Sequence, residues 1–472
     1  MPKRRSTLDA APSKHRRNEP HVTTVICGVY AEGKAAVARC LLKELKSATV
    51  LVSSLEEGQA AVPKKGGAFE VRDYKTETPQ LPPQHPRQNV VVLSHDLARP
   101  SRIAAAMAGS DECALPVVRL LTVLDARSFL DDWESAAELP VAVREAAKKD
   151  VRAHLHDQKA CVVLADHVES ADVIALCHAE SADTDELEMQ EAMLHELNPS
   201  ATVVRREGAG EGGGQLLAHL ARASSERPPP AERGGCWQAL LAARRHDDDG
   251  AEAEAEEEAE EEADDDDDDD EGEEEGEEDE VCRLGDDDDA DGEEEGEEEG
   301  EEGEEGEEGE EEGEWIAPVM SQFTFLARRP FHPVRLHRLL KRGRLDGVIR
   351  SRGLIWVATH QKECVVWNQV GNSMDLSPGE PWLQTTGVPI DQWPSDAPCW
   401  ARTALHGDRR TEIGLVGMDA DPAGVISTLR RALVTKAEFE RGVWGRDEDV
   451  QHVRRYWWLL GKHAMAQAGA TP

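Results

Sequence analysis

Short apolar segments alternate with longer amphipathic segments through the first half of the chain. The apolar segments are rich in valine and lie at 22–27, 48–52, 90–93, 117–124, 173–176 and 201–204. Segments with a helical spacing of apolar residues, such as 34–45 and 184–197, separate them. Short runs that are apolar on both faces are typical of buried parallel strands, and strands that alternate with helices imply one sheet with crossover helices. Residues 22–245 are therefore predicted to form an α/β domain.

The last third of the chain has a different pattern, which predicts an α+β domain over residues 315–445. Predicted strands cover 323–326, 347–351, 355–359, 363–368 and 413–418, and predicted helices cover 334–341 and 423–433. Nine of the 11 tryptophans lie after residue 314, a heavy apolar load for a domain of this size. A final amphipathic helix is predicted within residues 446–472. Its adjacent rings, Trp457 and Trp458, point about 100° apart, so the helix either packs between two surfaces or presents one ring to a partner.

Acidic residues are concentrated in one segment. Residues 247–314 hold 47 of the 96 acidic residues and one of the 53 basic residues, so the rest of the chain is close to neutral. The segment repeats Glu-Glu-Gly and has almost no aliphatic side chains, so residues 246–314 are predicted to form a disordered, solvated linker. Three roles remain open: a solubilising spacer, a docking segment for basic surfaces such as those of ribosomal proteins, or a weak site for hard cations.

The two ends of the chain and its cysteines exclude several classes of protein. Residues 1–21 form a basic tail, for which a disordered arm, a targeting signal and a nucleic-acid contact are the open alternatives. No apolar run is long enough to span a membrane, and no apolar signal-peptide core follows the N-terminus. The nine cysteines form no CxxC or CxC pair, which argues against a disulfide framework or a cysteine-rich zinc module. We therefore expect a cytoplasmic protein without membrane contact and without direct DNA binding.

One segment has the composition of a phosphate-binding loop. Gly28 follows a predicted strand, and Gly33 and Lys34 open a predicted helix, in the order GxxxxGK. Glycines in such a loop let backbone N–H groups face phosphate oxygens, and the lysine neutralises those oxygens. Two positions depart from this pattern, because Ala35 stands where a hydroxyl would hold Mg²⁺ and Glu32 adds a negative charge. The alternative interpretation is a glycine turn beside a solvated lysine.

Five motifs follow one another in the C-terminal third of the chain. They are 325–336 (FLARRPFHPVRL), 347–353 (GVIRSRG), 355–359 (IWVAT), 367–371 (WNQVG) and 408–413 (DRRTEI). Their content and order resemble the CobW C-terminal domain. In the first half, segments 89–100, 120–133 and 166–176 resemble the GTPase domain that accompanies it in that family.

This resemblance implies an α/β P-loop-type domain and an α+β CobW C-terminal domain, joined here by the disordered acidic linker. It also implies a GTP-dependent metallochaperone for zinc, cobalt or another metal. By the same resemblance, Gly28, Gly33 and Lys34 would contact the phosphates of GTP, and Glu180 would accept hydrogen bonds from the guanine edge.

The chain departs from the family at each position that carries chemistry. Ala35 replaces the hydroxyl that holds Mg²⁺, and Leu93-Ser94-His95 replaces the Glu-Ser/Thr-Gly turn. The segment 177–180 (CHAE) replaces the guanine-reading Asn-Lys-x-Asp, and only its Glu180 can still accept hydrogen bonds. The Cys-x-Cys-Cys metal motif is missing, so the chain has no thiolate cluster there for a soft metal.

These losses predict a pseudo-GTPase that acts as a binding or adaptor protein in metal homeostasis, with zinc as the expected metal. Some actinobacterial CobW-like proteins with eroded nucleotide motifs act on ribosomes under zinc starvation and recruit a hibernation factor. A client protein, the ribosome or such a factor is therefore the expected partner. The alternative is an active GTP hydrolase that uses Gly28, Gly33 and Lys34 and delivers zinc or cobalt to a client. GTP and zinc are the candidate cofactors, and the sequence names no metal ligands.

Overall fold

In the computed structural model, residues 1–249 and 317–472 belong to a first unit, separate from residues 250–316. The residues that it describes are 22–29, 31–45, 47–52, 55–65, 67–73, 89–94, 99–100, 103, 117–135, 159–207, 213–223, 237, 317–341, 345–394, 397, 399–404 and 406–441. All of them belong to the first unit. The basic tail, the acidic linker and the final helix with Trp457 and Trp458 lie outside the described residues.

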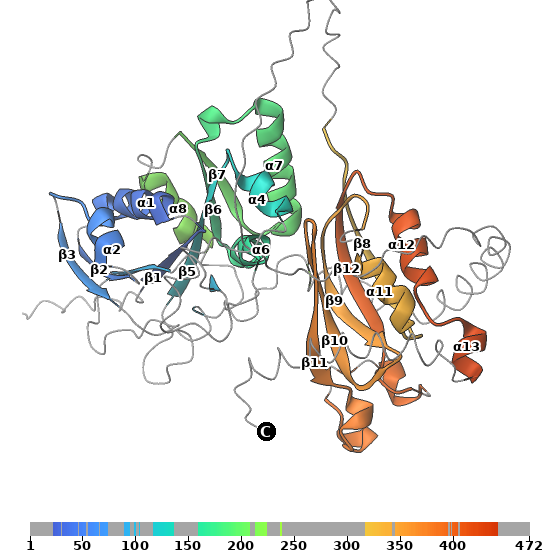
Figure 1. The fold of residues 1–472 in the computed structure, drawn as a ribbon. Helices are drawn as coiled ribbons and strands as arrows, with labels where there is room; N and C mark the ends of the chain where they lie inside the picture. Colours follow the sequence, from blue (N-terminus) through green and yellow to red (C-terminus); the bar gives the residue numbers. More distant parts are fainter. Residues whose placement is uncertain are drawn as a thin grey trace, which may run out of the picture. The chain divides into compact units, whose positions relative to one another are not determined.

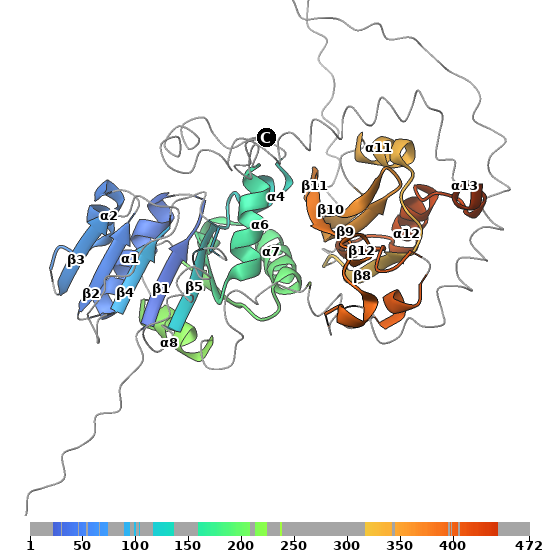
Figure 2. The same cartoon turned by 90° about the horizontal axis from the view of Figure 1, so that it is seen from below.

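The first half of the chain contains a seven-stranded parallel sheet with the order β3-β2-β4-β1-β5-β6-β7, part of which Figure 2 shows edge to edge. In register, Val25 of β1 lies beside Val92 of β4 and Leu120 of β5. The six predicted strands are all present, and the α/β prediction is confirmed. The strands are β1 (Val22–Cys27), β2 (Ser47–Val52), β3 (Ala68–Asp73), β4 (Asn89–Leu93), β5 (Val117–Asp125), β6 (Val173–Cys177) and β7 (Thr202–Arg206).

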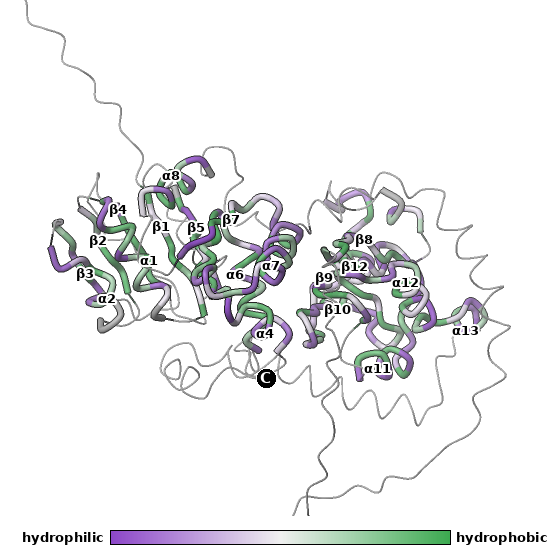
Figure 3. Tube along the Cα trace, turned by 90° about the horizontal axis from the view of Figure 1, so that it is seen from above, coloured by the Kyte–Doolittle hydropathy of each residue, from purple (hydrophilic) through white to green (hydrophobic). Residues whose placement is uncertain are grey.

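Strand β3 was not predicted from the sequence, and its place in the sheet explains why. It is an edge strand, and its sequence AFEVRD alternates half-buried Phe69 and Val71 with exposed Glu70 and Arg72. Figure 3 shows hydrophilic colour on β3, in contrast to the hydrophobic colour of the central strands. A search for continuous apolar runs misses a strand that is buried on one face only.

Helices cover both faces of the parallel sheet (Figure 1). Alternate residues of β6 show the two layers, because Val173 and Ala175 pack with α1 and α8, whereas Ile174 and Leu176 pack with α4, α6 and α7. The helices are α1 (Ala31–Glu44), α2 (Leu55–Ala61), α4 (Phe129–Glu134), α6 (Ala160–Ser170), α7 (Thr184–Leu197) and α8 (Gly213–Ala223), with a 3₁₀ turn η2 (Ala179–Ser181). None of the described helices is long and apolar enough to cross a membrane.

The second half contains a five-stranded antiparallel sheet with the order β11-β10-β9-β12-β8 (Figure 1). Its strands are β8 (Met320–Ala327), β9 (Val348–Val357), β10 (His360–Val370), β11 (Ser373–Pro381) and β12 (Thr411–Met418). Helices α11 (Pro333–Lys341) and α12 (Pro422–Arg431) pack on one face of it, around Phe331, Trp367 and Leu429. The remaining elements are α13 (Lys436–Arg441) and the 3₁₀ turns η4 (Leu383–Thr385), η5 (Ile390–Gln392) and η6 (Cys399–Arg402). The α+β prediction is confirmed.

Two predicted strands, 347–351 and 355–359, are one continuous strand in the structure, so the predicted break was wrong. Gly353 lies in the predicted gap, yet in the structure it is within β9, paired with Trp367 and Ile413. A Cβ atom built on Gly353 would lie 2.0 Å from the Glu412 carbonyl oxygen. The glycine is therefore needed for the close approach of β12 and does not end the strand.

Candidate functional site

The predicted phosphate-binding loop lies at the end of the central strand of the parallel sheet. From β1 the chain passes through α1 to β2, beyond β4, whereas β5 lies on the other side of β1. The carboxyl end of β1 is therefore the point where the strand order reverses, which is where open α/β sheets bind ligands. Gly28 and Val29 follow β1 directly, and α1 begins at Ala31.

Lys34 lies inside the protein and not at its surface. Its residue exposure is 0%, and its ammonium donates a hydrogen bond of 2.6 Å to the carbonyl oxygen of Ser94. Because α1 already begins at Ala31, Lys34 belongs to the first turn of the helix. The interpretation as a solvated lysine is thus wrong. The ammonium that would neutralise phosphate is hydrogen-bonded to the backbone at the end of β4.

The two glycines of the loop pack against the neighbouring strand β5. A Cβ atom built on Gly28 would lie 2.8 Å from the carbonyl oxygen of Val123 and 3.2 Å from Cγ of Lys34. One built on Gly33 would lie 3.3 Å from Cγ1 of Val123. The structure therefore brings Gly28, Gly33 and Lys34 together around Val123. In this arrangement the glycines permit close packing with β5.

Ala35 and Cys27 make the surroundings of Lys34 apolar. Ala35 is buried in the core that also contains Ile26 and Leu121. Burial raises the pKa of the Cys27 thiol to about 12, and a hydrogen bond with Ser94 and the charge of Lys34 oppose this rise. Within the described residues, the position that would hold Mg²⁺ thus offers a methyl group, and the adjacent sulfur is a thiol at neutral pH.

Glu180 lies at the ends of β5 and β6, in a cluster of charged groups. It is exposed on η2, and its carboxylate is 3.7 Å from Nδ1 of His178. His178 adopts a left-handed conformation, with φ of 60° and ψ of 30°, which is uncommon for a residue with a side chain. Asp125, at the end of β5, accepts hydrogen bonds of 2.9 and 2.7 Å from the guanidinium of Arg127.

The ion pair between Asp125 and Arg127 was not predicted as part of the site. The hydrogen bond from Arg127 is the main cause that lowers the pKa of Asp125, and nearby His178 adds to it. The signal in the sequence was local, because the two residues are separated by one position at the end of a predicted strand. Asp125 is therefore held by a side chain of its own turn.

The described residues contain no group of three or more histidine, cysteine or acidic side chains that could hold a metal ion. Cys27, Cys40, Cys161, Cys177 and Cys364 are free thiols, and all five are buried. Burial raises the pKa of Cys177 to about 11 and also raises those of Cys161 and Cys364. Since a thiol must lose its proton to bind zinc, these positions favour the neutral thiol over a metal thiolate.

The residues at the loop do not fit a magnesium nucleotide held in the manner that the resemblance implies. Such a ligand needs a hydroxyl at position 35 and a lysine directed at the phosphates. The structure has a buried methyl group at the first position and a lysine bonded to Ser94 at the second. Gly28, Gly33 and Lys34 instead make contacts within the protein.

Comparison with known proteins identifies the C-terminal half. Residues 320–433 match the family profile described as the cobalamin synthesis protein cobW C-terminal domain. A protein of Mycobacterium tuberculosis named a zinc chaperone is 30% identical over 120 residues, which are 24% of this chain and 29% of that protein. The zinc-regulated GTPase metalloprotein activator 1 of Dictyostelium discoideum is 29% identical over 140 residues, 26% of this chain and 28% of that protein.

The chain therefore carries a CobW C-terminal domain, and the resemblance inferred from its motifs is confirmed for that domain. The matched segments span less than a third of the length of these relatives. Among solved structures, the Zn(II)-bound YjiA GTPase from E. coli aligns over 88% of this chain and 100% of its own, with a TM-score of 0.30 and 10% identity. The fold of the first half is defined by its own strand order.

Proposed function

We propose that this chain is a pseudo-GTPase that acts as a binding or adaptor protein in metal homeostasis, with zinc as the metal. One observation carries the proposal: Lys34 is fully buried and bonded to Ser94, and Ala35 lies in the apolar core. Two relatives of this chain are named for zinc, and this supports the choice of metal. On this proposal, the chain keeps the fold of a CobW-like GTPase but no longer hydrolyses GTP.

The polar groups that a GTPase would direct at its ligand instead make hydrogen bonds within this chain. The ammonium of Lys34 donates to Ser94, and the carboxylate of Asp125 accepts from Arg127. A ligand that bound Lys34 or Asp125 would have to break these contacts. For Lys34 this would cost free energy, because its buried ammonium would lose the hydrogen bond to Ser94. The internal contacts therefore favour a fixed loop over one that responds to nucleotide.

Calorimetric titration with GTP, GDP and ATP, with and without Mg²⁺, tests the loss of nucleotide binding. We expect no binding heat up to millimolar nucleotide. The variant Ala35→Ser is the matched control, because it supplies the missing hydroxyl with a small increase in volume. We expect it to remain silent, since Lys34 is still engaged. Micromolar, Mg²⁺-dependent and guanine-preferring binding by the parent chain would instead support an active GTPase metallochaperone, the alternative that the name of the Dictyostelium relative favours.

The acidic segment is proposed to dock basic surfaces, such as those of the ribosome or of a hibernation factor. Its concentration of charge supports this, because residues 247–314 hold 47 acidic residues and one basic residue. Deletion of that segment is expected to abolish co-sedimentation with ribosomes from zinc-starved cells at low salt, where exposed charges are least screened. A variant with a Gly-Ser segment of equal length separates charge from spacing and is expected to fail as well. Full binding by the Gly-Ser variant would make the segment a spacer.

A further inference from the structure

A buried ion pair joins the α/β half to the CobW C-terminal domain. Glu169, in the last turn of α6, accepts a hydrogen bond of 2.7 Å from Nε of Arg350 on β9. The side chains of Glu169 and Arg350 are only 6% and 4% exposed. Arg352 also approaches the carboxylate, at 3.5 Å, but is 51% exposed. Buried charges are retained only where geometry and further hydrogen bonds compensate for lost hydration.

Arg350 has such compensation on both sides. Its NH1 group donates to the carbonyl oxygens of Ser351 and Gln369, each at 2.8 Å, and to the side chain of Asn368 at 2.9 Å. Its guanidinium also lies over the ring of Trp237, 5.2 Å from the centroid. The β-sheet thus positions the guanidinium, and the α/β half supplies the carboxylate and the aromatic ring.

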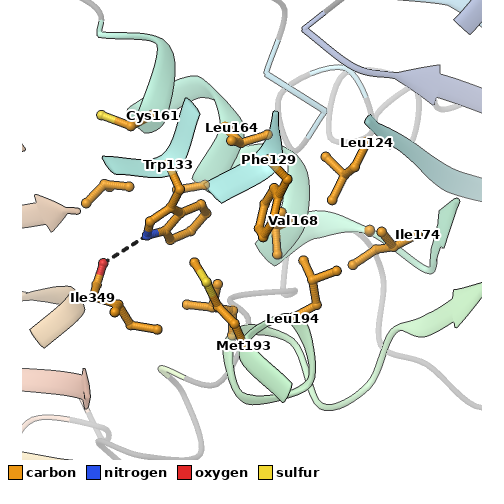
Figure 4. Packing of buried hydrophobic residues seen from close by; sticks show 14 of the residues in the cluster. Leu124, Phe129, Trp133, Cys161, Leu164, Val168, Ile174, Met193, Leu194 and Ile349 are labelled. Carbon is orange, nitrogen blue, oxygen red and sulfur yellow. Dashed lines mark hydrogen bonds between the residues drawn. The ribbon is translucent and has the colours of Figure 1, made fainter. Parts of the chain in front are cut away.

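Close backbone contacts accompany the ion pair. Gly371 lies in the turn between β10 and β11 with a φ of 49°, and a Cβ atom there would lie 2.3 Å from the carbonyl oxygen of Trp133. The next residue, Asn372, donates a hydrogen bond of 3.0 Å to the carbonyl oxygen of Glu134. Trp133 itself donates to the carbonyl oxygen of Ile349 at 3.1 Å (Figure 4). Only glycine permits this approach of the turn to α4.

The described residues on either side of the acidic segment pack into the same hydrophobic cluster. Trp237, the last described residue before it, is buried among residues of α4, α6 and α7 together with Ile349 and Val416. Met320, which begins β8 after it, packs against that cluster. We infer that the α/β half and the CobW C-terminal domain form one body held by this interface, and that they do not behave as two independent domains.

This inference goes beyond the proposed function and does not depend on it, because nucleotide plays no part in the interface. The test uses the full chain with the recognition sequence of a site-specific protease in place of residues 281–287. After cleavage, we expect the two fragments to co-elute in size-exclusion chromatography at micromolar concentration in high salt. High salt screens repulsion between the two acidic ends but affects buried pairs much less. Separation of the cleaved fragments would overturn the inference.

Charge reversal at the ion pair makes the test specific. In the cleaved protein, Glu169→Arg is expected to weaken the association about 100-fold, because it places a second guanidinium against the buried Arg350. Arg352→Glu is the matched control, and we expect it to leave the fragments associated, because its side chain is half exposed. Circular dichroism before cleavage verifies that each variant is folded. If the folded Glu169→Arg protein keeps its fragments together as firmly as the parent, the ion pair does not hold the halves together and the inference fails.

Discussion

Replacement of Trp133 by alanine is expected to lower the free energy of unfolding by about 3–5 kcal/mol, the range for removal of a fully buried aromatic side chain. Trp133 is 1% exposed and lies 5.8 Å from the ring of Phe129. Its cluster contains residues of both sheets, among them Ile174 and Val370. The substitution therefore removes packing from the two halves at once. Urea denaturation followed by far-UV circular dichroism measures the change.

Trp133→Phe separates the volume of the ring from its hydrogen bond. The carbonyl oxygen of Ile349, which accepts from Trp133, also accepts from the backbone N–H of Gly371 at 2.9 Å. It would thus retain a partner, and we expect the phenylalanine variant to cost about 1–2 kcal/mol, less than the alanine variant. A loss below about 1 kcal/mol for Trp133→Ala would contradict a role for this ring in joining the halves.

The pattern of apolar positions predicted most strands of both sheets, because those strands are buried on both faces or on one well-defined face. The pattern failed for strands whose position depends on hydrogen-bonded pairing with a neighbouring strand and not on burial of their side chains. Strand β11 was not predicted; it contains Pro378, Gly379 and Pro381, residues more typical of loops, yet it is an edge strand and pairs with β10. Proline is tolerated at such an edge because one side of the strand needs no ladder hydrogen bonds.

The position of the candidate site could also be predicted, since a strand, a glycine loop and a helix are local features. The state of Lys34 could not. The order GxxxxGK is the same whether the lysine faces phosphate, water or the core, and the acceptor that decides the matter lies 60 residues later, at Ser94. The pair Glu169–Arg350 is separated by 181 residues. Nothing in a single sequence links two charges that are so far apart along the chain.

Lys34→Ala is expected to destabilise the protein by about 3 kcal/mol, because it removes a fully buried side chain and leaves a cavity beside β5. The carbonyl oxygen of Ser94 also loses the donor that lies 2.6 Å away. Lys34→Met keeps the volume of the stem, and we expect it to cost about 1 kcal/mol, since the lost hydrogen bond is partly offset by removal of a desolvated charge. Urea denaturation of the three proteins gives the comparison.

The order of these variants in free energy of unfolding distinguishes a lysine packed in the core from one that binds phosphate. A lysine that faces phosphate is solvated in the free protein, so its loss reduces nucleotide affinity and leaves stability nearly unchanged. Lys43→Ala, at an exposed position of the same helix, is the matched control, and no measurable change in stability is expected for it. If Lys34→Ala also left stability unchanged and abolished binding of a guanine nucleotide, the lysine would serve a ligand and the pseudo-GTPase proposal would be wrong. A large loss of stability, with no nucleotide bound by any of the variants, identifies Lys34 as part of the core that holds α1 against β4 and β5.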